Sequence, residues 1–457
     1  MHRGREYRSC TFWKSEKLVT EVSTIEACWA DRSRLHDYQL VRLQELVRTI
    51  IPRNRFWNDR FAAAGLDAGV ITDLSDLQRL PFCTKQDLVS DQEQQPPYGS
   101  NLTYPSTAFR RLHQTSGTTG RPLRWLDTAD SWNWILECWR QIYQLAGVNS
   151  WDRLFFPFSF GPFLGFWGAF DGAQQAGHFC IAGGGMSTAV RLRALIENEA
   201  TVLCCTPTYA LRMAEVAAAE GLDLQESSVR LLIVAGEAGG TIPATRQRIE
   251  DLWDARVIDH WGMTEIGSLA VESEDRPGGM YLLETECIAE VLLEDGTAAA
   301  PGQPGELVLT NLGRQATPLL RYRTGDIVCV SQQEDPAGRC LRWLEGGIIG
   351  RADDMVVIRG NNVFPGSIEA VLREFSEVQE FRIEVSTVRE MKELRVVVEP
   401  TADAVLTPDL PAFQQRVADS LRQRLGFLID VRMAEPGSLP RSEMKSRRLV
   451  HLDDEQS

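Results

Sequence analysis

The residues with the clearest chemical capability lie in one short stretch rich in glycine and hydroxyl side chains. From Thr115 to Pro122 the chain has four hydroxyl residues and three glycines or prolines in eight positions, which disfavours a regular helix or strand. Glycine lets the backbone approach a ligand closely, and hydroxyl and backbone N–H groups can donate to phosphate oxygens. A surface turn between two strands is the alternative. The predicted phosphate-binding residues are Thr115, Ser116, Gly117, Thr118, Thr119 and Gly120.

This loop is not a Walker A motif, because no Gly-Lys-Ser/Thr follows it. Four motifs further along the chain nevertheless favour the phosphate-binding interpretation. They are Trp261-Gly-Met-Thr-Glu265, Arg321-Tyr-Arg-Thr-Gly-Asp326, Gly350-Arg-Ala-Asp-Asp-Met-Val-Val-Ile-Arg-Gly360 and Leu439-Pro-Arg-Ser-Glu-Met-Lys445. With the loop, and in the same order, they resemble the signatures of the adenylate-forming enzymes, which include acyl-CoA synthetases, adenylation domains and luciferases. Each motif alone is a weak pattern, but five in order leave little room for a chance match.

Within this superfamily the chain resembles the phenylacetate–CoA ligases. The resemblance rests on Leu80-Pro-Phe-Cys-Thr-Lys85, on Asn362-Val-Phe-Pro365 and on the Leu-Pro-Arg-Ser-Glu tail, and it extends from about residue 40 to the end. It implies that a carboxylic acid reacts with ATP to give an acyl-adenylate and pyrophosphate. The acyl group would then pass to a thiol, which the resemblance indicates is coenzyme A.

The resemblance also implies the fold class. We expect an α/β protein with a large layered N-terminal adenylating domain, residues 1–350, and a small mobile C-terminal α+β lid domain, residues 351–457. A chain of 457 residues exceeds what one hydrophobic core usually serves, which also favours two domains. Alternating strand and helix patterns in the first part, such as the buried run Leu231–Ala235, favour a layered α/β arrangement.

The resemblance places the nucleotide between three segments. Trp261 would stack on the adenine, where relatives usually have a tyrosine, and the indole lacks the tyrosine hydroxyl. Asp326 would accept from both ribose hydroxyls, which a carboxylate can do at once. The backbone of Gly236, Glu237 and Ala238 would border the adenine, at the kind of strand end where α/β folds open a crevice. A tight strand-to-helix turn would need the same glycines.

Charged and hydroxyl residues receive the catalytic roles. Thr264 would contact the α-phosphate, and Glu265 would bind Mg²⁺, which prefers hard oxygen ligands. Arg351 would contact ribose or phosphate. Lys445 would stabilise the negative charge that develops on the carboxylate and the α-phosphate. The residue before this lysine is Met444, where the family usually has glycine.

Two further positions concern the smaller domain. Asp353 matches the hinge about which the family's C-terminal domain rotates, and a hinge must absorb a large backbone change. Gly360 matches the glycine along the tunnel for the thiol acceptor. Apolar spacing in this part predicts a helix over 368–375 capped by Ser367, a second helix near 413–425, and strands near 381–385 and 394–398.

The most aromatic stretch runs from Leu154 to Phe170. Its glycines and prolines exclude one long helix, so we predict a strand, a turn and a helix start. The resemblance places the acyl pocket here, and Phe158, Phe160 and Phe163 would suit a flat, apolar aryl or arylalkyl acid. Ordinary hydrophobic core is an equally weighted alternative.

Composition limits the possible partners and surroundings. The net charge is −15 and no Lys/Arg block stands out, which argues against nucleic acid and against an anionic membrane as partners. No apolar run has membrane-spanning length and the N-terminus does not resemble a secretory signal, so a cytoplasmic protein is expected. The ten cysteines include no C-x-x-C pair, and we expect reduced thiols and no structural zinc.

Two alternatives to the interpretation as a CoA ligase stay open. One is transfer of the acyl group to a carrier protein or another acceptor. The other is a nucleotide-binding homologue with impaired catalysis, a possibility raised by the departures at Trp261 and Met444. Local patterns also predict a helix from Leu40 to Ala64 and a helix from Lys85 capped by Thr84.

Overall fold

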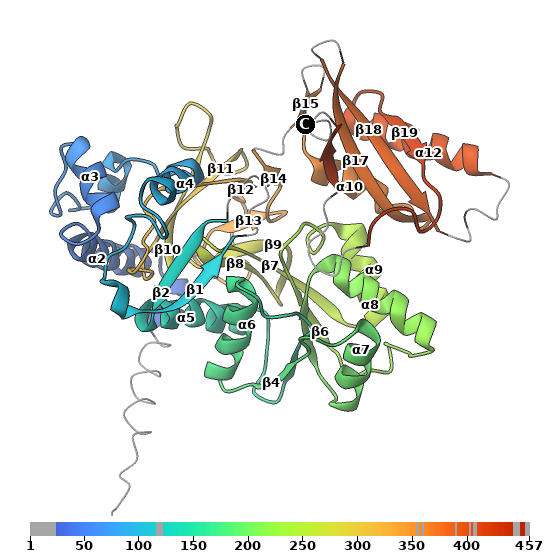
Figure 1. The fold of residues 1–457 in the computed structure, drawn as a ribbon, viewed down its shortest axis with the longest axis horizontal. Helices are drawn as coiled ribbons and strands as arrows, with labels where there is room; N and C mark the ends of the chain where they lie inside the picture. The colour runs from blue at the N-terminus through green and yellow to red at the C-terminus, as the bar shows by residue number, and fades with distance from the viewer. Residues whose placement is uncertain are drawn as a thin grey trace, which may run out of the picture.

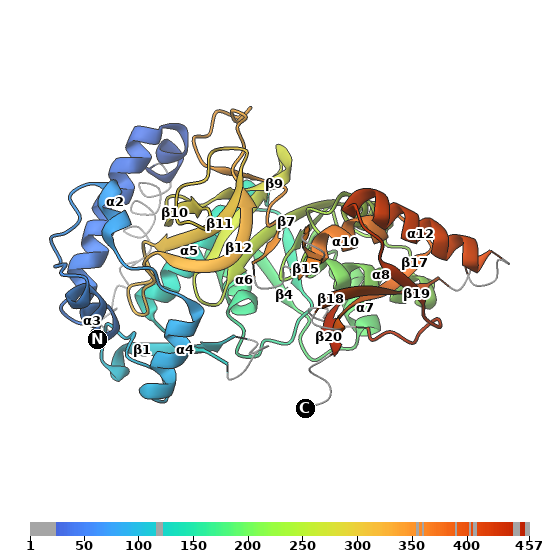
Figure 2. The same ribbon diagram turned by 90° about the horizontal axis from the view of Figure 1, so that it is seen from above.

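The computed structural model describes residues 24–115, 122–352, 356–358, 361–388, 391–401, 404, 409–441 and 448–452. The predicted site residues Ser116 to Gly120, Asp353, Gly360 and Lys445 lie outside these ranges. The chain forms a large N-terminal domain and a smaller C-terminal domain, which lies beside α8 and α9 (Figures 1 and 2).

The first part of the described chain is helical. It contains α2 (Arg32–Ile50), α3 (Arg55–Ala63), η1 (Leu74–Arg79), α4 (Lys85–Gln94) and η2 (Ser106–Ala108). The prediction of one helix from Leu40 to Ala64 is wrong, because α2 ends before Pro52 and the Asn54 side chain caps a new helix. Thr84 caps α4 as predicted, in a capping box with Asp87.

An eight-stranded sheet forms the centre of the N-terminal domain. Five neighbouring strands are parallel, from β4 to β7, and the remaining three continue the sheet in antiparallel fashion. The order is β13 (Trp343–Glu345), β9 (Arg276–Leu282), β8 (Gly267–Ser273), β7 (Arg256–Met263), β6 (Leu231–Val234), β5 (Val202–Cys205), β3 (Arg153–Phe156) and β4 (Phe179–Ala182).

Helices cover both faces of this sheet. Successive residues of β6 alternate between two hydrophobic clusters: Leu231 and Ile233 join the one that contains α5 (Ala129–Leu145) and α6 (Leu164–Gln175). Leu232 and Val234 join the one formed by α7 (Thr188–Glu197), α8 (Pro207–Glu220) and α9 (Pro243–Trp253). A strand buried on both faces has no polar alternation, which explains why it appears as a continuous apolar run in the sequence.

A second sheet and a hairpin complete the N-terminal domain. The antiparallel sheet has the order β10 (Cys287–Leu292), β11 (Pro304–Asn311), β12 (Tyr322–Cys329) and β14 (Gly350–Arg351). The hairpin pairs β1 (Phe109–Gln114) with β2 (Arg124–Thr128), so the glycine-rich loop connects two antiparallel strands.

The C-terminal domain has its own core around a four-stranded sheet. The sheet order is β19 (Asp430–Met433), β18 (Met391–Pro400), β17 (Val378–Val388) and β20 (Leu449–His451), and the domain adds β15 (Val356–Ile358), β16 (Asn361–Val363), α10 (Pro365–Leu372) and α12 (Leu410–Leu425). The predicted cap at Ser367 is wrong: α10 begins at Pro365, whose fixed φ suits the first helical position. The predicted α/β fold class with its two unequal domains is confirmed.

Among the described helices, none combines the length and the apolar composition that crossing a bilayer requires.

Close packing between α5 and α6 depends on glycine. A Cβ at Gly172 would lie 2.6 Å from the Cβ of Trp139, whereas a Cβ at Gly165, on the same helix, would meet nothing within 4 Å. We therefore expect Gly172→Ala to lower the free energy of unfolding by about 1–3 kcal/mol, because the two helices must move apart. Gly165→Ala is the matched control, and the better helix propensity of alanine should leave stability unchanged or raise it by up to about 1 kcal/mol. Urea denaturation measures both. Equal effects of the two substitutions would contradict the packing argument.

Candidate active site

Three of the predicted nucleotide-binding residues meet where the two sheets of the N-terminal domain approach each other. The Trp261 indole N–H donates to Asp326 Oδ2 at 3.1 Å. Arg351 Nη1 lies 3.2 Å from Asp326 Oδ1. The motifs that contain these residues are separated by long stretches of sequence, and the fold brings them into direct contact.

The strands explain this convergence. Trp261 lies on β7 of the central sheet, while Asp326 and Arg351 are directly paired residues on β12 and β14. The Thr324 hydroxyl accepts the backbone N–H of Asp326 at 3.0 Å, and Gly325 has a φ of +75°, a turn conformation that favours glycine. The Asp326 carboxylate is buried, but each carboxylate oxygen can accept more than one hydrogen bond. Its contacts with Trp261 and Arg351 hold the carboxylate in one orientation.

The indole of Trp261 thus does more than replace a tyrosine ring. Its N–H is a donor that fixes one oxygen of the acid expected to hold the ribose. The residue is only partly buried, so part of its surface remains accessible.

A fully buried arginine, Arg314, holds the neighbouring motif in place. Its Nε and Nη2 donate to the two oxygens of Asp127 at 2.8 and 2.7 Å. Its Nη1 donates to the backbone carbonyls of Thr264 and Glu265 at 2.6 and 3.1 Å. Because Asp127 lies on β2, this one side chain connects the hairpin that carries the glycine-rich loop to the segment after β7.

The charge of Asp127 is stabilised by this arrangement. Burial opposes ionisation, but the charge and hydrogen bonds of Arg314, with the nearby His113, outweigh it, so the pKa of Asp127 lies below its ordinary value. His113 Nδ1 lies 3.5 Å from Asp127 Oδ2. Neither Arg314 nor Asp127 was identified from the sequence, because an isolated arginine and aspartate carry no motif, and burial is a property of the folded chain.

Glu265 is suited to a divalent cation. Its carboxyl is buried, and burial raises its pKa above the ordinary value, although its own backbone N–H and the charges of Lys85, Arg351 and Arg314 favour ionisation. In the described part of the chain no group of three or more His, Cys, Asp or Glu side chains could hold a metal ion. A single carboxylate fits Mg²⁺, which commonly takes one or two protein ligands and completes its shell with phosphates and water.

The loop after β6 lies beside this site. Strands β6 and β7 are parallel neighbours, with Val234 opposite Asp259, so Gly236 and Trp261 both follow the same edge of the sheet. Gly236 has a φ of +93°, and Glu237 Oε1 accepts the backbone N–H of Thr208 at 2.9 Å. Gly236 and Ala238 are exposed.

The base of the glycine-rich loop is closed by a pair of hydrogen bonds. The N–H of Thr115 donates to the Leu123 carbonyl at 3.0 Å, and the Thr115 hydroxyl accepts the N–H of Leu123 at 3.0 Å. The Gln114 N–H donates to the Pro162 carbonyl at 2.7 Å. The loop therefore starts next to the aromatic segment.

That segment has the predicted strand, turn and helix start, in β3 and α6. Its phenylalanines form one cluster: Phe158 stacks on Phe166 with ring centroids 4.2 Å apart, Phe160 lies 5.5 Å from Phe158, and Phe163 lies 5.9 Å from Phe166. The three predicted pocket residues are partly exposed, and Phe158 and Phe160 also pack against the main hydrophobic core of the N-terminal domain.

Comparison with known proteins identifies the family. The model of the AMP-binding enzyme family matches residues 85–313, and the model of the AMP-binding enzyme C-terminal domain matches residues 360–452. The chain belongs to the AMP-binding, or adenylate-forming, enzymes, as the motifs predicted.

The chain is similar to several acid–CoA ligases. The chain is 30% identical over 440 residues to a phenylacetate-coenzyme A ligase of Thermus thermophilus, an alignment that covers 92% of this chain and 97% of that protein. Among solved structures it is similar to 2-hydroxyisobutyryl-CoA ligase in the postadenylation state with 2-HIB-AMP, with a TM-score of 0.86, 29% identity, and coverage of 91% and 89%. The same ligase in the thioesterification state with 2-HIB-AMP and CoA gives a TM-score of 0.69, 29% identity, and coverage of 93% and 91%.

The buried ion pair yields a stability prediction. Arg314→Met should lower the free energy of unfolding by about 3–5 kcal/mol, because it leaves the Asp127 carboxylate buried without its partner. The double variant Arg314→Met/Asp127→Leu should recover part of this loss, since no unpaired charge then remains. Arg323→Met removes the partly exposed pair with Glu306 and is expected to cost less than about 1 kcal/mol. Chemical denaturation of the four proteins provides the comparison, and a double variant less stable than Arg314→Met would refute the explanation.

Proposed function

We propose that this protein activates a carboxylic acid with ATP, releasing pyrophosphate and forming an acyl-adenylate, and then transfers the acyl group to coenzyme A. The contact of Trp261, Arg351 and Asp326 carries this proposal, because three distant motifs of one family form a single site in this chain. Similarity to two acid–CoA ligases over about nine-tenths of the chain supports it. The protein is an AMP-forming ligase of the acid–CoA type.

The residues act by binding and by electrostatics. Trp261 stacks on the adenine, Asp326 accepts from the ribose, and the backbone of Gly236, Glu237 and Ala238 borders the base. Thr115 and the loop residues Ser116 to Gly120 hold the phosphates. No residue acts as a covalent nucleophile, so the rate depends on positioning two anions and neutralising their charge.

Three charged residues stabilise the reacting groups. Glu265 holds Mg²⁺, which neutralises phosphate charge when bound. Arg351 contacts the ribose or a phosphate, and Thr264 contacts the α-phosphate. Lys445 bridges the acid carboxylate and the α-phosphate while the new bond forms. The fixed positions of Thr264 and Glu265 come from the hydrogen bonds that Arg314 makes to their carbonyls.

The acid is an aryl or arylalkyl acid. The clustered, partly exposed rings of Phe158, Phe160 and Phe163 next to the start of the phosphate-binding loop support this assignment. The name of the Thermus thermophilus relative, a phenylacetate ligase, points to the same class.

The boundary expected between residues 350 and 351 would divide β14, both of whose residues pair with β12, so the proposed boundary lies just after this strand. Asp353 would be the hinge, and Gly360 would lie beside the thiol tunnel. Separate cores on the two sides of this point support the division.

The proposed activity is tested by pyrophosphate release from purified protein with ATP and Mg²⁺, over a panel of aryl, arylalkyl and aliphatic acids, with and without coenzyme A. We expect release with aryl or arylalkyl acids, and faster turnover when coenzyme A is present. If acyl-adenylate forms but no thioester follows, the acceptor is a carrier protein or another molecule instead of coenzyme A. If no acid in the panel causes pyrophosphate release although the protein still binds ATP, it is a non-catalytic nucleotide-binding protein.

The role of Trp261 is tested by substitution. Trp261→Ala removes both the ring and the N–H donated to Asp326, and stacking of a base on an aromatic ring is worth about 1–3 kcal/mol. The KM for ATP should therefore rise at least about fivefold, with a smaller change in the KM for the acid. Trp151→Ala, which removes an exposed tryptophan distant from the site in sequence, is the matched control and should leave both constants unchanged. An unaltered KM for ATP in Trp261→Ala would rule out adenine stacking.

A further inference from the structure

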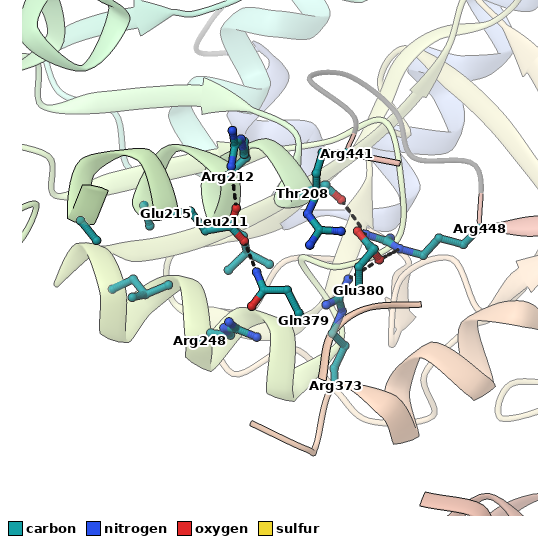
Figure 3. Close-up of a pocket in the computed structure, with 13 residues that line it drawn as sticks. Thr208, Leu211, Arg212, Glu215, Arg248, Arg373, Gln379, Glu380, Arg441 and Arg448 are labelled. Carbon is teal, nitrogen blue, oxygen red and sulfur yellow. Dashed lines mark hydrogen bonds and ion pairs between the residues drawn. The ribbon is translucent and has the colours of Figure 1, made fainter. Parts of the chain in front are cut away.

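Arg448 lies where the C-terminal domain meets α8, and its guanidinium contacts both. Within its own domain, Nε donates to Glu380 Oε1 at 2.8 Å and Nη1 to Glu369 Oε1 at 3.1 Å. Across the interface between the two domains, which we call the seam, Nη2 donates to the hydroxyl of Thr208 at 3.1 Å. Thr208 lies in the first turn of α8. The three side chains Arg448, Glu380 and Thr208 converge in Figure 3. The planar five-donor fork of arginine allows these contacts at the same time.

Thr208 extends this contact to the proposed nucleotide site. Its backbone N–H donates to Glu237 Oε1 at 2.9 Å, so two successive hydrogen bonds lead from Arg448 to the loop after β6. Burial opposes the charge on Arg448, but the carboxylates of Glu369, Glu380 and Glu237 raise its pKa above the ordinary value and keep it protonated. We call Arg448, Thr208, Glu237, Glu369 and Glu380 the Arg448 clasp.

The interface between the C-terminal domain and helices α8 and α9 contains further polar contacts. The Gln379 amide donates to the Glu215 carboxylate, and Arg248 Nη1 donates to the Val378 carbonyl at 3.5 Å. A cavity of about 150 Å³ lies between α8, α9 and the C-terminal domain, and both charged residues, such as Arg248 and Glu215, and apolar residues, such as Leu211 and Leu252, line it (Figure 3). Polar domain interfaces of this kind permit relative motion unless specific contacts hold them. The hydrogen bond between Arg448 and Thr208 is one of the specific contacts that join the two domains.

Arg448 lies close in sequence to the proposed catalytic lysine, since it follows Lys445 by three residues. Lys445 itself lies outside the described residues. The arrangement of the whole chain matches the postadenylation-state structure of 2-hydroxyisobutyryl-CoA ligase better than the thioesterification-state structure of the same protein, with TM-scores of 0.86 and 0.69.

We propose that Arg448 is a positioning residue for adenylate formation: its hydrogen bond to Thr208 holds the C-terminal domain, whose sequence includes the lysine motif, against α8 and the loop after β6. This inference rests on the proposed two-step reaction. We expect the contact to favour the first step, because the domain arrangement in which it forms is more similar to the postadenylation-state structure than to the thioesterification-state structure of the same ligase. Loss of the clasp therefore slows adenylation and leaves acyl transfer intact.

The decisive variant is Thr208→Val, which removes the acceptor hydroxyl and keeps the backbone N–H that Glu237 binds. The pairs of Arg448 with Glu369 and Glu380 also remain, so the C-terminal domain keeps its own contacts. Adenylation is measured as acid-dependent exchange of pyrophosphate into ATP, and acyl transfer as thioester formation from synthetic acyl-adenylate and coenzyme A. We expect kcat for exchange to fall about three- to tenfold with little change in the KM for ATP, and acyl transfer to be unchanged or faster.

A double-mutant cycle with Arg448→Met locates the effect at this pair. The double variant should exchange pyrophosphate no more slowly than Arg448→Met alone, because the two substitutions remove one shared contact. Thr188→Val is the matched control, since its hydroxyl contacts Tyr209 within the N-terminal domain. Any effect of this control should fall equally on the two half-reactions. Equal losses of exchange and transfer in Thr208→Val, or no loss of exchange, would overturn the proposal.

A second readout does not depend on catalysis. Hydrogen–deuterium exchange of peptides covering 207–220 and 376–382 should become faster in Thr208→Val, on both sides of the seam, and stay unchanged in Thr188→Val at 376–382. Unchanged exchange at the seam would refute the clasp even if the enzyme is active. If the wild-type protein forms no adenylate with any acid, the proposed function fails, and this measurement alone decides whether the clasp exists.

Discussion

The buried ion pair between Arg314 and Asp127 is the constraint on which the candidate site depends. Arg314 uses one edge of its guanidinium for the Asp127 carboxylate and the remaining donor for the carbonyls of Thr264 and Glu265. Two segments that are far apart in sequence are thereby held at a fixed separation. A buried pair of this kind contributes little net stability, but breaking it is costly, so it acts mainly to specify one arrangement.

The second organising feature is the meeting of two sheets. Trp261 lies on β7 of the central sheet, and Asp326 and Arg351 are paired residues of the smaller sheet. Hydrogen bonds between paired strands fix the backbone positions of Asp326 and Arg351. The hydrogen bonds from Trp261 and Arg351 then orient the Asp326 carboxylate. Rigid strands thus carry the proposed nucleotide contacts, which suits a reaction that depends on positioning.

The seam between the domains has the opposite physical character. Its contacts are polar hydrogen bonds around a cavity, whereas each domain has its own apolar core. An interface without a continuous apolar layer can separate and reform at modest free-energy cost. Placing the lysine motif on the domain beyond such a seam is consistent with a two-step enzyme whose two reactions need different surroundings.

The sequence by itself determined the family, the fold class and the roles expected of Trp261, Asp326 and Arg351, because short motifs and apolar periodicity are local properties. It also predicted the cap at Thr84 correctly, but it placed one helix across Pro52 and a cap at Ser367, where neighbouring prolines set the helix starts and ends. Only the tertiary structure identified Arg314, Asp127 and the Thr208–Arg448 contact. These are single polar residues without a motif, and their partners lie far away in the chain, so their importance arises from burial and contacts that exist only after folding.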